Sequence, residues 1–242
     1  LAANTTAANN TAVGALALTA NTTGTNNVAT GHRALITNTT GSNNVSSGAS
    51  AVAANTTGND NAALGSGALA SNTTASNNAA VGKGSLLLNT TGASNSALGQ
   101  AALVSNTTGT QNTAVGDAAG DAITTGSQNT FIGFNAAGAA TTGTLNSFLG
   151  RSSGSAMTTG SKNTLIGSYN GNQNSLDLRT SSNNIVLSDG DGNGRFRASA
   201  DGQIVVGDSI QSYGGGGYTG TGFTVNQDSN DYNAAFRTNT ST

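Results

Sequence analysis

The sequence contains no Glu, Pro, Cys or Trp, and charged residues make up only 7% of its 242 residues. Without cysteine no disulfide framework can form. With a single histidine, His32, and no cysteine the chain can build no Cys/His transition-metal site, and we expect no His-based catalytic triad. The net charge of −2 contrasts with the excess of Lys and Arg that is typical of nucleic-acid-binding proteins. We therefore expect no enzyme activity, no cofactor, no metal and no nucleic-acid partner.

Large apolar residues are also scarce. The hydrophobic fraction is 35%, and alanine is its most frequent residue, which leaves too little volume for a wide globular core. No apolar run approaches the roughly 20 residues of a membrane-spanning helix, so we expect no membrane insertion. Disorder usually accompanies high net charge or many prolines, and both are missing. No signal peptide is visible, and because the chain starts at Leu1 we expect it to be cut from a longer protein.

What the sequence does contain is a repeat of seventeen residues, most regular at 106–116, N-T-T-G-T-Q-N-T-A-V-G. It runs through ten copies in one register without an insertion. A fixed short period of this kind is typical of stacked repeat architectures. The residues that return in step are Asn10, Asn27, Asn44, Asn61, Asn78, Asn95, Asn112, Asn129, Asn146 and Asn163, and Gly14, Gly31, Gly48, Gly65, Gly82, Gly99, Gly116, Gly133, Gly150 and Gly167.

The apolar part of each copy is short and bounded by Gly and Asn, which leaves no room for a helix. The repeat therefore predicts an all-β fold, in which residues 1–171 form a β-solenoid of ten coils about 4.8 Å apart. Asn95 and Asn112 should be stacked neighbours in an amide ladder. The glycine that ends each copy suits a corner with positive φ or close backbone approach. The Asn-Thr-Thr-Gly segment predicts a turn whose side chains bond to local backbone.

Each copy has adjacent apolar residues, such as Ala114 with Val115 and Ala102 with Leu103. Neighbouring side chains of a strand point to opposite faces, so one member of each pair should line the coil and the other should lie outside. An outward apolar row in ten coils is typical of an interface. We therefore expect the chain to associate with two identical chains as a homotrimer.

The last copies predict a change of packing inside the solenoid. Ala114 is replaced at the same position by Phe131, Phe148 and Leu165, while Leu103 is replaced by small residues: Gly120, Ala137, Gly154 and Gly171. Side-chain volume is thus added on one side of the coil and removed from the other. The rings of Phe131 and Phe148 should stack with centroids about 4.5–7 Å apart.

The sequence of residues 172–242 predicts a Gly/Asp-rich β-stalk or the start of a further β-domain. Strands are expected at 185–187, 195–198 and 203–206, the first two joined by S-D-G-D-G-N-G. Asp189 and Asp191 match the start of an EF-hand calcium loop, but Ala200 stands where that loop needs a bidentate Glu. A hairpin turn is the alternative, since D-G and N-G are turn dipeptides.

Three further patterns have both functional and structural interpretations. Tyr213, Tyr218 and Tyr232 could contact a ligand or pack a small β-domain. Asp117 and Asp121 could act as paired carboxylates on a glycan, although solvated turn positions explain them more simply. Seven N-T-T triplets are formal N-glycosylation acceptors or bare turns, at Asn4, Asn21, Asn38, Asn55, Asn72, Asn89 and Asn106.

The phrases N-T-A-V-G-D-A-A (112–119) and N-T-F-I-G-F-N-A-A (129–137) resemble head repeats of trimeric autotransporter adhesins, whose repeat is shorter. The longer version with N-T-T-G is similar to repeats of bacteriophage tail fibres, and residues 183–207 resemble the stalk segment of such fibres. The resemblance implies a homotrimeric β-roll fibre on a virion or cell surface that attaches to a host glycan or protein. A bacterial trimeric adhesin and, from the threonine content, an ice-binding solenoid remain alternatives.

Overall fold

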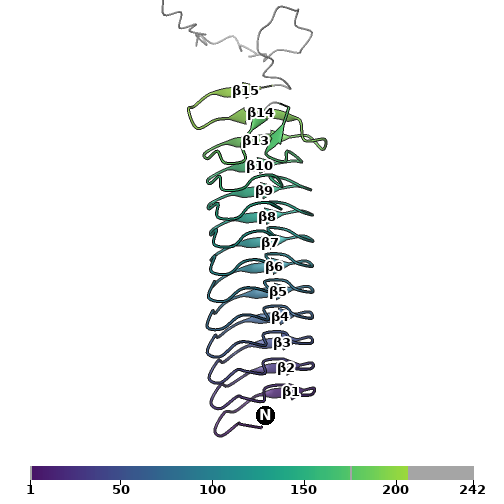
Figure 1. Cartoon of the computed structure of the whole chain (residues 1–242), viewed down its shortest axis with the longest axis vertical. Helices are drawn as coiled ribbons and strands as arrows, with labels where there is room; N and C mark the ends of the chain where they lie inside the picture. The colour runs from purple at the N-terminus through teal and green to yellow at the C-terminus, as the bar shows by residue number, and fades with distance from the viewer. Residues whose placement is uncertain (1, 175, 207–242) are drawn as a thin grey trace, which may run out of the picture. The chain divides into compact units, whose positions relative to one another are not determined.

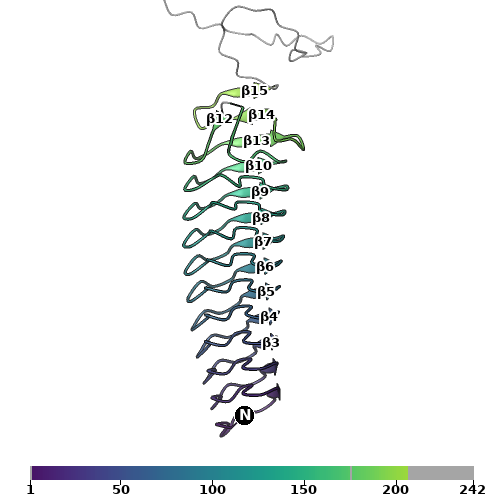
Figure 2. The same cartoon turned by 45° about the vertical axis from the view of Figure 1, so that its right-hand side comes forward.

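The computed structural model describes residues 2–174 and 176–206, which form an all-β stack of coils (Figure 1). Within those residues there is no helix at all, and hence none long and apolar enough to cross a membrane. These residues form fifteen strands, and all but β11 and β12 lie above one another along one side of the stack (Figure 2). The strands are β1 (Thr11–Val13), β2 (Val28–Thr30), β3 (Val45–Ser47), β4 (Ala62–Leu64), β5 (Ala79–Val81), β6 (Ser96–Leu98), β7 (Thr113–Val115), β8 (Thr130–Ile132), β9 (Ser147–Leu149), β10 (Thr164–Ile166), β11 (Asn172–Gln173), β12 (Leu176–Asp177), β13 (Ile185–Ser188), β14 (Gly194–Ala198) and β15 (Ile204–Val206).

The register of the sheet confirms one coil per seventeen residues. Each strand from β1 to β10 pairs in parallel with the next, so that Ala97 lies beside Ala114 and Ala114 beside Phe131. The backbone N–H of Asn112 donates to the side-chain oxygen of Asn95 at 2.9 Å, as expected for stacked neighbours. The fold is therefore a β-solenoid of ten coils.

The sheet continues past the last repeat. β10 pairs in parallel with β13, and β13, β14 and β15 then pair antiparallel, which completes a thirteen-stranded sheet. The three strands expected at 185–187, 195–198 and 203–206 are thus confirmed. β11 and β12 form a separate two-stranded hairpin beside the last coil.

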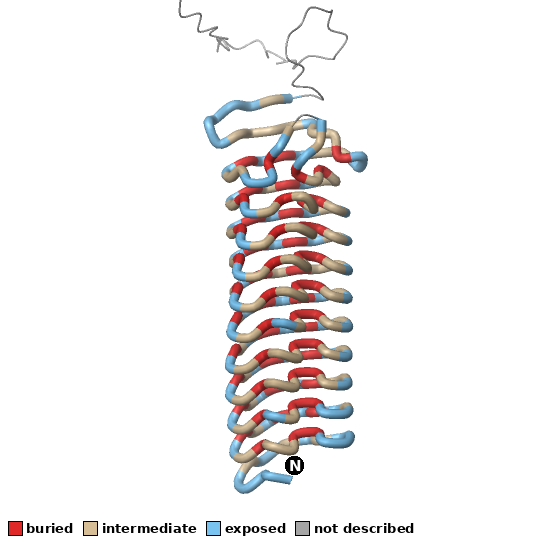
Figure 3. The backbone as a smooth tube through the Cα atoms, in the orientation of Figure 1, coloured by how far each residue is buried: buried red, intermediate tan, exposed pale blue. Residues whose placement is uncertain are grey.

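The core is a narrow column that recurs at the same place in every coil (Figure 3). One buried row consists of the middle residue of each strand, which is Ala, Ser, Phe or Leu from β2 to β10. A second buried row contains Leu35, Leu69, Leu86 and Leu103. Because alanine fills so much of the column, backbone contacts and side-chain hydrogen bonds must contribute much of its cohesion.

Two buried asparagine ladders supply those hydrogen bonds. In the ladder predicted from the repeat, Asn112 donates from Nδ2 to the Gly126 carbonyl at 2.8 Å, and its Oδ1 accepts the N–H of Asn129 at 3.0 Å. The second ladder is formed by the Asn of Asn-Thr-Thr-Gly, where Asn106 donates to Oδ1 of Asn89 at 2.9 Å and to the Gly109 carbonyl at 3.0 Å. The latter bond is the local turn contact that the sequence predicted.

The second ladder ends abruptly at its last asparagine. The next coil has Ile123 at this position, whose side chain has no N–H group, and Oδ1 of Asn106 is buried without a hydrogen-bond partner. Ala140 and Met157 occupy the two positions above it and are also buried. The solenoid therefore changes from an amide-bonded corner to an apolar one between coils that contain Asn106 and Ile123.

The threonine pairs bond differently from the expectation. Oγ1 of Thr107 donates to the carbonyl oxygen of Thr124 in the next coil at 3.0 Å, and Thr90 bonds to Thr107 in the same way. The predicted bond to local backbone was therefore wrong for the first threonine of each pair. Stacking places the carbonyl of the next coil within reach of the hydroxyl, and a single coil considered alone cannot reveal this.

The interpretation of Ala102 and Leu103 was also wrong. Both side chains are fully buried, although adjacent residues of a strand would point to opposite faces. The segment is a turn, and Leu103 has a φ of 53°, so its side chain is rotated back toward the core. Each coil has one three-residue strand, because residues with positive φ interrupt the rest of it.

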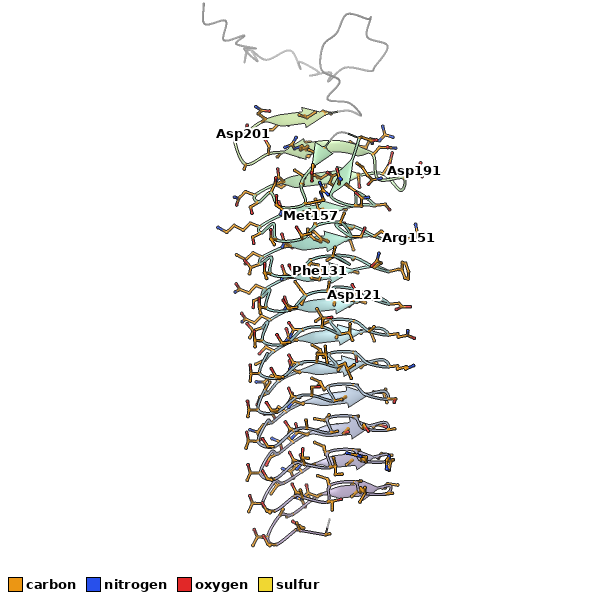
Figure 4. All side chains as sticks on the ribbon, viewed as in Figure 1. Asp121, Phe131, Arg151, Met157, Asp191 and Asp201 are labelled. Carbon is orange, nitrogen blue, oxygen red and sulfur yellow. The ribbon has the colours of Figure 1, made fainter. Side chains whose placement is uncertain are left out.

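The predicted change of packing is confirmed. The rings of Phe131 and Phe148 are buried with centroids 5.4 Å apart and planes tilted by 33°. A Cβ atom on Gly120 would lie 2.7 Å from the Phe131 ring, and one on Gly154 would overlap the Phe148 ring. Leu165, at the same position one coil later, is also buried. Figure 4 shows Phe131 within the stack, with Met157 in the region above it.

Candidate functional site

The outer surface of the sheet is the most distinctive surface of the solenoid. Strand alternation buries Ala97, at 3% exposure, and leaves its neighbour Leu98 at 51%. Each strand of the sheet places at least one large apolar residue on this side. We call this set the apolar face: Val13, Val28, Val45, Leu64, Val81, Leu98, Val115, Ile132, Leu149, Ile166, Leu187, Phe196 and Val206.

The apolar face has no gap at the second and third coils, where the repeat pattern is weakest. Thr30 and Ser47 stand there in place of the usual Val or Leu. In the same two strands the first residue, Val28 or Val45, is apolar and exposed on the same side. An apolar residue has moved by two positions, which preserves the face because strand side chains alternate with period two. The pattern at the third strand position alone did not predict this compensation.

A second surface consists of threonines. In each pair after the first, the first threonine, such as Thr107, is half-buried and bonded to the next coil, and the second, such as Thr108, is exposed. Only one row of hydroxyls is therefore free, whereas an ice-binding surface of the predicted kind needs two rows from one strand. Six of the seven glycosylation triplets have buried asparagines, which agrees with their interpretation as bare turns; Asn4 is exposed.

The S-D-G-D-G-N-G segment forms the hairpin turn between β13 and β14. Oδ1 of Asp189 accepts the backbone N–H groups of Asp191, at 3.0 Å, and Asn193, at 2.9 Å, and the Arg195 guanidinium bonds to Oδ2. Desolvation acts to raise the pKa of Asp189, but these hydrogen bonds outweigh it and hold the pKa at about 2. The carboxylate is thus engaged within the turn, which favours the hairpin over the calcium loop.

Asp191 projects from the edge of the stack in Figure 4. Among residues 2–174 and 176–206 no three His, Cys, Asp or Glu side chains gather where they could hold a metal ion. The described residues therefore offer no candidate metal centre.

Asp117 and Asp121 occupy different environments. Asp117 is exposed, while Asp121 is half-buried, and its Oδ1 is enclosed without a hydrogen-bond partner. Desolvation raises the pKa of Asp121, only partly opposed by hydrogen bonds from the backbone of residues 121 and 122. Asp117 and Asp121 are four residues apart in the sequence, and no hydrogen bond joins their side chains. A partly desolvated carboxylate can act in acid–base chemistry, but a buried oxygen without a hydrogen-bond partner also lowers stability.

Substituting Asp121 by Asn should stabilise the solenoid at neutral pH. Because burial raises the folded-state pKa of Asp121 above its usual value of 3.8, the free energy of unfolding falls as the pH rises from 3.8 through the folded-state pKa, and it changes no further above that pKa. The free energy of unfolding of Asp121→Asn should therefore exceed that of the wild type by an amount that grows over this pH range. The difference should level off at less than about 1 kcal/mol, because the half-buried carboxylate keeps part of its hydration. Urea unfolding at pH 3 to 8 measures this difference, with exposed Asp117→Asn as the control; a gain that is independent of pH would contradict it.

Tyr213, Tyr218 and Tyr232 lie outside the described residues, so their role as ligand contacts stays a prediction. No protein-family model, no curated protein and no solved structure matches the chain.

Proposed function

We propose that this chain is a rod-forming segment of an extracellular attachment fibre, in which three identical chains associate through their apolar faces. The observation that carries the proposal is the continuity of that face over all thirteen strands of the sheet. Exposed apolar patches on soluble monomers rarely exceed a few hundred Å², and larger ones are typical of interaction sites. A face that runs the length of the solenoid needs a cover of the same length, and a second copy of the chain provides one.

Threefold association suits this geometry. Each chain turns one flat sheet toward a common axis, and three such faces close a ring without leaving an edge exposed. Closing the ring also buries the three apolar faces against one another. They form a second apolar core between the chains, and this burial offsets the small apolar volume inside each coil. The resemblance to adhesin heads and phage tail fibres supports the same arrangement and the location on a virion or cell surface.

A rod of this kind acts as a spacer and a display surface. Its seventeen-residue coils add length in steps of about 4.8 Å without changing the cross-section. The low content of charged residues favours a structural role over a catalytic one. Attachment to a host surface would use side chains that remain exposed after the apolar faces are covered.

Leu98→Asp tests the proposal against a matched control, Leu88→Asp. The two leucines have similar exposure, 51% and 46%, but Leu98 lies on the apolar face and Leu88 lies in a turn outside the strands. A carboxylate buried between chains without a partner is costly, so Leu98→Asp should dissociate the assembly or prevent it from forming. Sedimentation equilibrium should give a trimer for the wild type and for Leu88→Asp, and a smaller species for Leu98→Asp. A folded monomeric wild type would remove the proposal.

A further inference from the structure

The ten coils differ strongly at the position directly after the corner glycine. The Asn and Gly rows of the repeat, by contrast, are invariant. This position changes in size, charge and aromaticity along the stack. Its residues, in order, are Ala15, His32, Ala49, Ser66, Lys83, Gln100, Asp117, Phe134, Arg151 and Ser168. Since the coils stack in register, these side chains form one row along an edge of the solenoid.

Five successive members have large polar, charged or aromatic side chains, and all five are exposed. The backbone keeps them aligned: the N–H of Asn135 donates to the Asp117 carbonyl at 2.9 Å, and that of Ser152 to the Phe134 carbonyl at 2.8 Å. At about 4.8 Å per coil the row is roughly 19 Å long. We call it the corner row: Lys83, Gln100, Asp117, Phe134 and Arg151.

The polar groups of the corner row are not used by the fold. Within the part of the chain that the structure describes, the two ion pairs are those of Arg179 with Asp177 and of Arg195 with Asp189. No side-chain hydrogen bond involves a member of the corner row. The exposed row that begins at Asn9 is different, because Asn26 bonds to Asn43 at 3.2 Å and Asn43 to Asp60 at 3.0 Å. The corner row thus keeps its donors and acceptors free.

Phe134 stands out within this row. At 53% exposure it is the only exposed aromatic among the described residues, since Phe131, Phe148 and Tyr169 are buried and Phe196 is half-buried. It lies between a carboxylate, Asp117, one coil below and a guanidinium, Arg151, one coil above. In Figure 4 Arg151 projects from the edge of the stack, on the same side as Asp191. An exposed ring between free charged groups is typical of a contact site.

We infer that the corner row binds an extended carbohydrate chain, with a sugar ring stacked on Phe134. A pyranose presents an apolar face of C–H groups that can cover the ring, and hydroxyls around its rim. Asp117 can accept hydrogen bonds from those hydroxyls, and Arg151 can donate two parallel hydrogen bonds to a hydroxyl pair or a sugar carboxylate. Gln100 and Lys83 continue the row with further donors.

The shape of the surface favours a glycan over a protein. Stable protein interfaces bury about 800 Å² on each partner around a well-packed core. The corner row is one residue wide, and the positions beside it carry small residues such as Ala101, Ala118 and Ser152. A narrow linear row suits a narrow linear polymer. The inference deepens the proposed attachment function and rests on it for its biological setting, although the binding itself does not require three chains.

The test uses the full chain and an array of defined neutral hexose oligosaccharides and uronate-containing oligosaccharides such as hyaluronan fragments. Phe134→Ala should lower the affinity for the oligosaccharides that bind by about tenfold or more, as expected for loss of a central aromatic contact. Phe134→Tyr should retain binding, because it keeps the ring. Leu145→Ala is the matched control, since Leu145 is similarly exposed at 47% but lies outside the corner row. Arg151→Gln should weaken the uronate-containing ligands more than the neutral ones.

The inference is overturned if the wild type binds none of these oligosaccharides, or if Phe134→Ala binds as the wild type does. It is also overturned if Phe134→Ala dissociates the assembly in sedimentation, because Phe134 would then belong to the interface between chains. A monomer that binds an oligosaccharide through Phe134 would instead support the inference and remove the proposed threefold fibre. Protein binding without glycan binding would assign the row to a protein partner and overturn it.

Discussion

Replacing Gly116 by alanine should destabilise the solenoid by about 3–5 kcal/mol, the sum of backbone strain and a steric clash. Gly116 has a φ of 134°, which side-chain-bearing residues rarely adopt. A Cβ atom here would lie 2.5 Å from the carbonyl oxygen of Gly133 in the next coil. That oxygen belongs to the stacked backbone and cannot move without separating the coils. Urea unfolding followed by circular dichroism should show the loss.

Gly84→Ala provides the control for this prediction. Gly84 also has a positive φ, 67°, but a Cβ atom there would meet nothing within 4 Å. At the same position in later coils Ala101 and Ala118 adopt φ values of 55° and 54°, so the repeat tolerates alanine in this conformation. Gly84→Ala should cost about 1 kcal/mol or less. Equal losses for the two substitutions would mean that the corner contact does not limit stability.

Phe148→Ala should cost about 3–5 kcal/mol, the usual range for a large aromatic removed from a packed core. Phe148 is 1% exposed and stacks on Phe131, so its removal leaves a cavity and an unsupported ring. Gly154→Leu alone should also destabilise, because its Cβ would overlap the Phe148 ring. Ala97→Phe should be destabilising for the converse reason, since Leu103 still fills the space that the ring would need.

The double substitution Phe148→Ala with Gly154→Leu should recover a large part of both losses. It recreates the pair found in the sixth coil, where Ala97 is followed six residues later by Leu103. Gly154 already has a φ of 64°, close to the 53° of Leu103, so leucine enters without a change of backbone. Contacting residues typically show coupling energies of about 0.5–3 kcal/mol, and this pair should lie at the upper end. If the losses of unfolding free energy for the two single substitutions simply add in the double variant, the side chains at positions 148 and 154 do not compensate for each other in volume.

The repeat by itself determined the solenoid. Its period places Asn95 beside Asn112 whatever the details of the coil, because identical sequences stack most favourably in register. The adjacent pair Ala97 and Leu98 likewise determined that one row faces inward and one outward, since strand side chains alternate. The exchange between Phe148 and Gly154 was also readable, because volumes in a narrow column must compensate.

Only the tertiary structure decided how each coil turns. Leu103 has a left-handed backbone that rotates its side chain inward, and no strand rule applied to the sequence could foresee this. The bond from Thr107 to Thr124 and the orphan oxygen of Asn106 beside Ile123 depend on what lies one coil above. The repeat determines which residues recur, but a hydrogen-bond partner or a free side chain such as Phe134 is determined by contacts between coils.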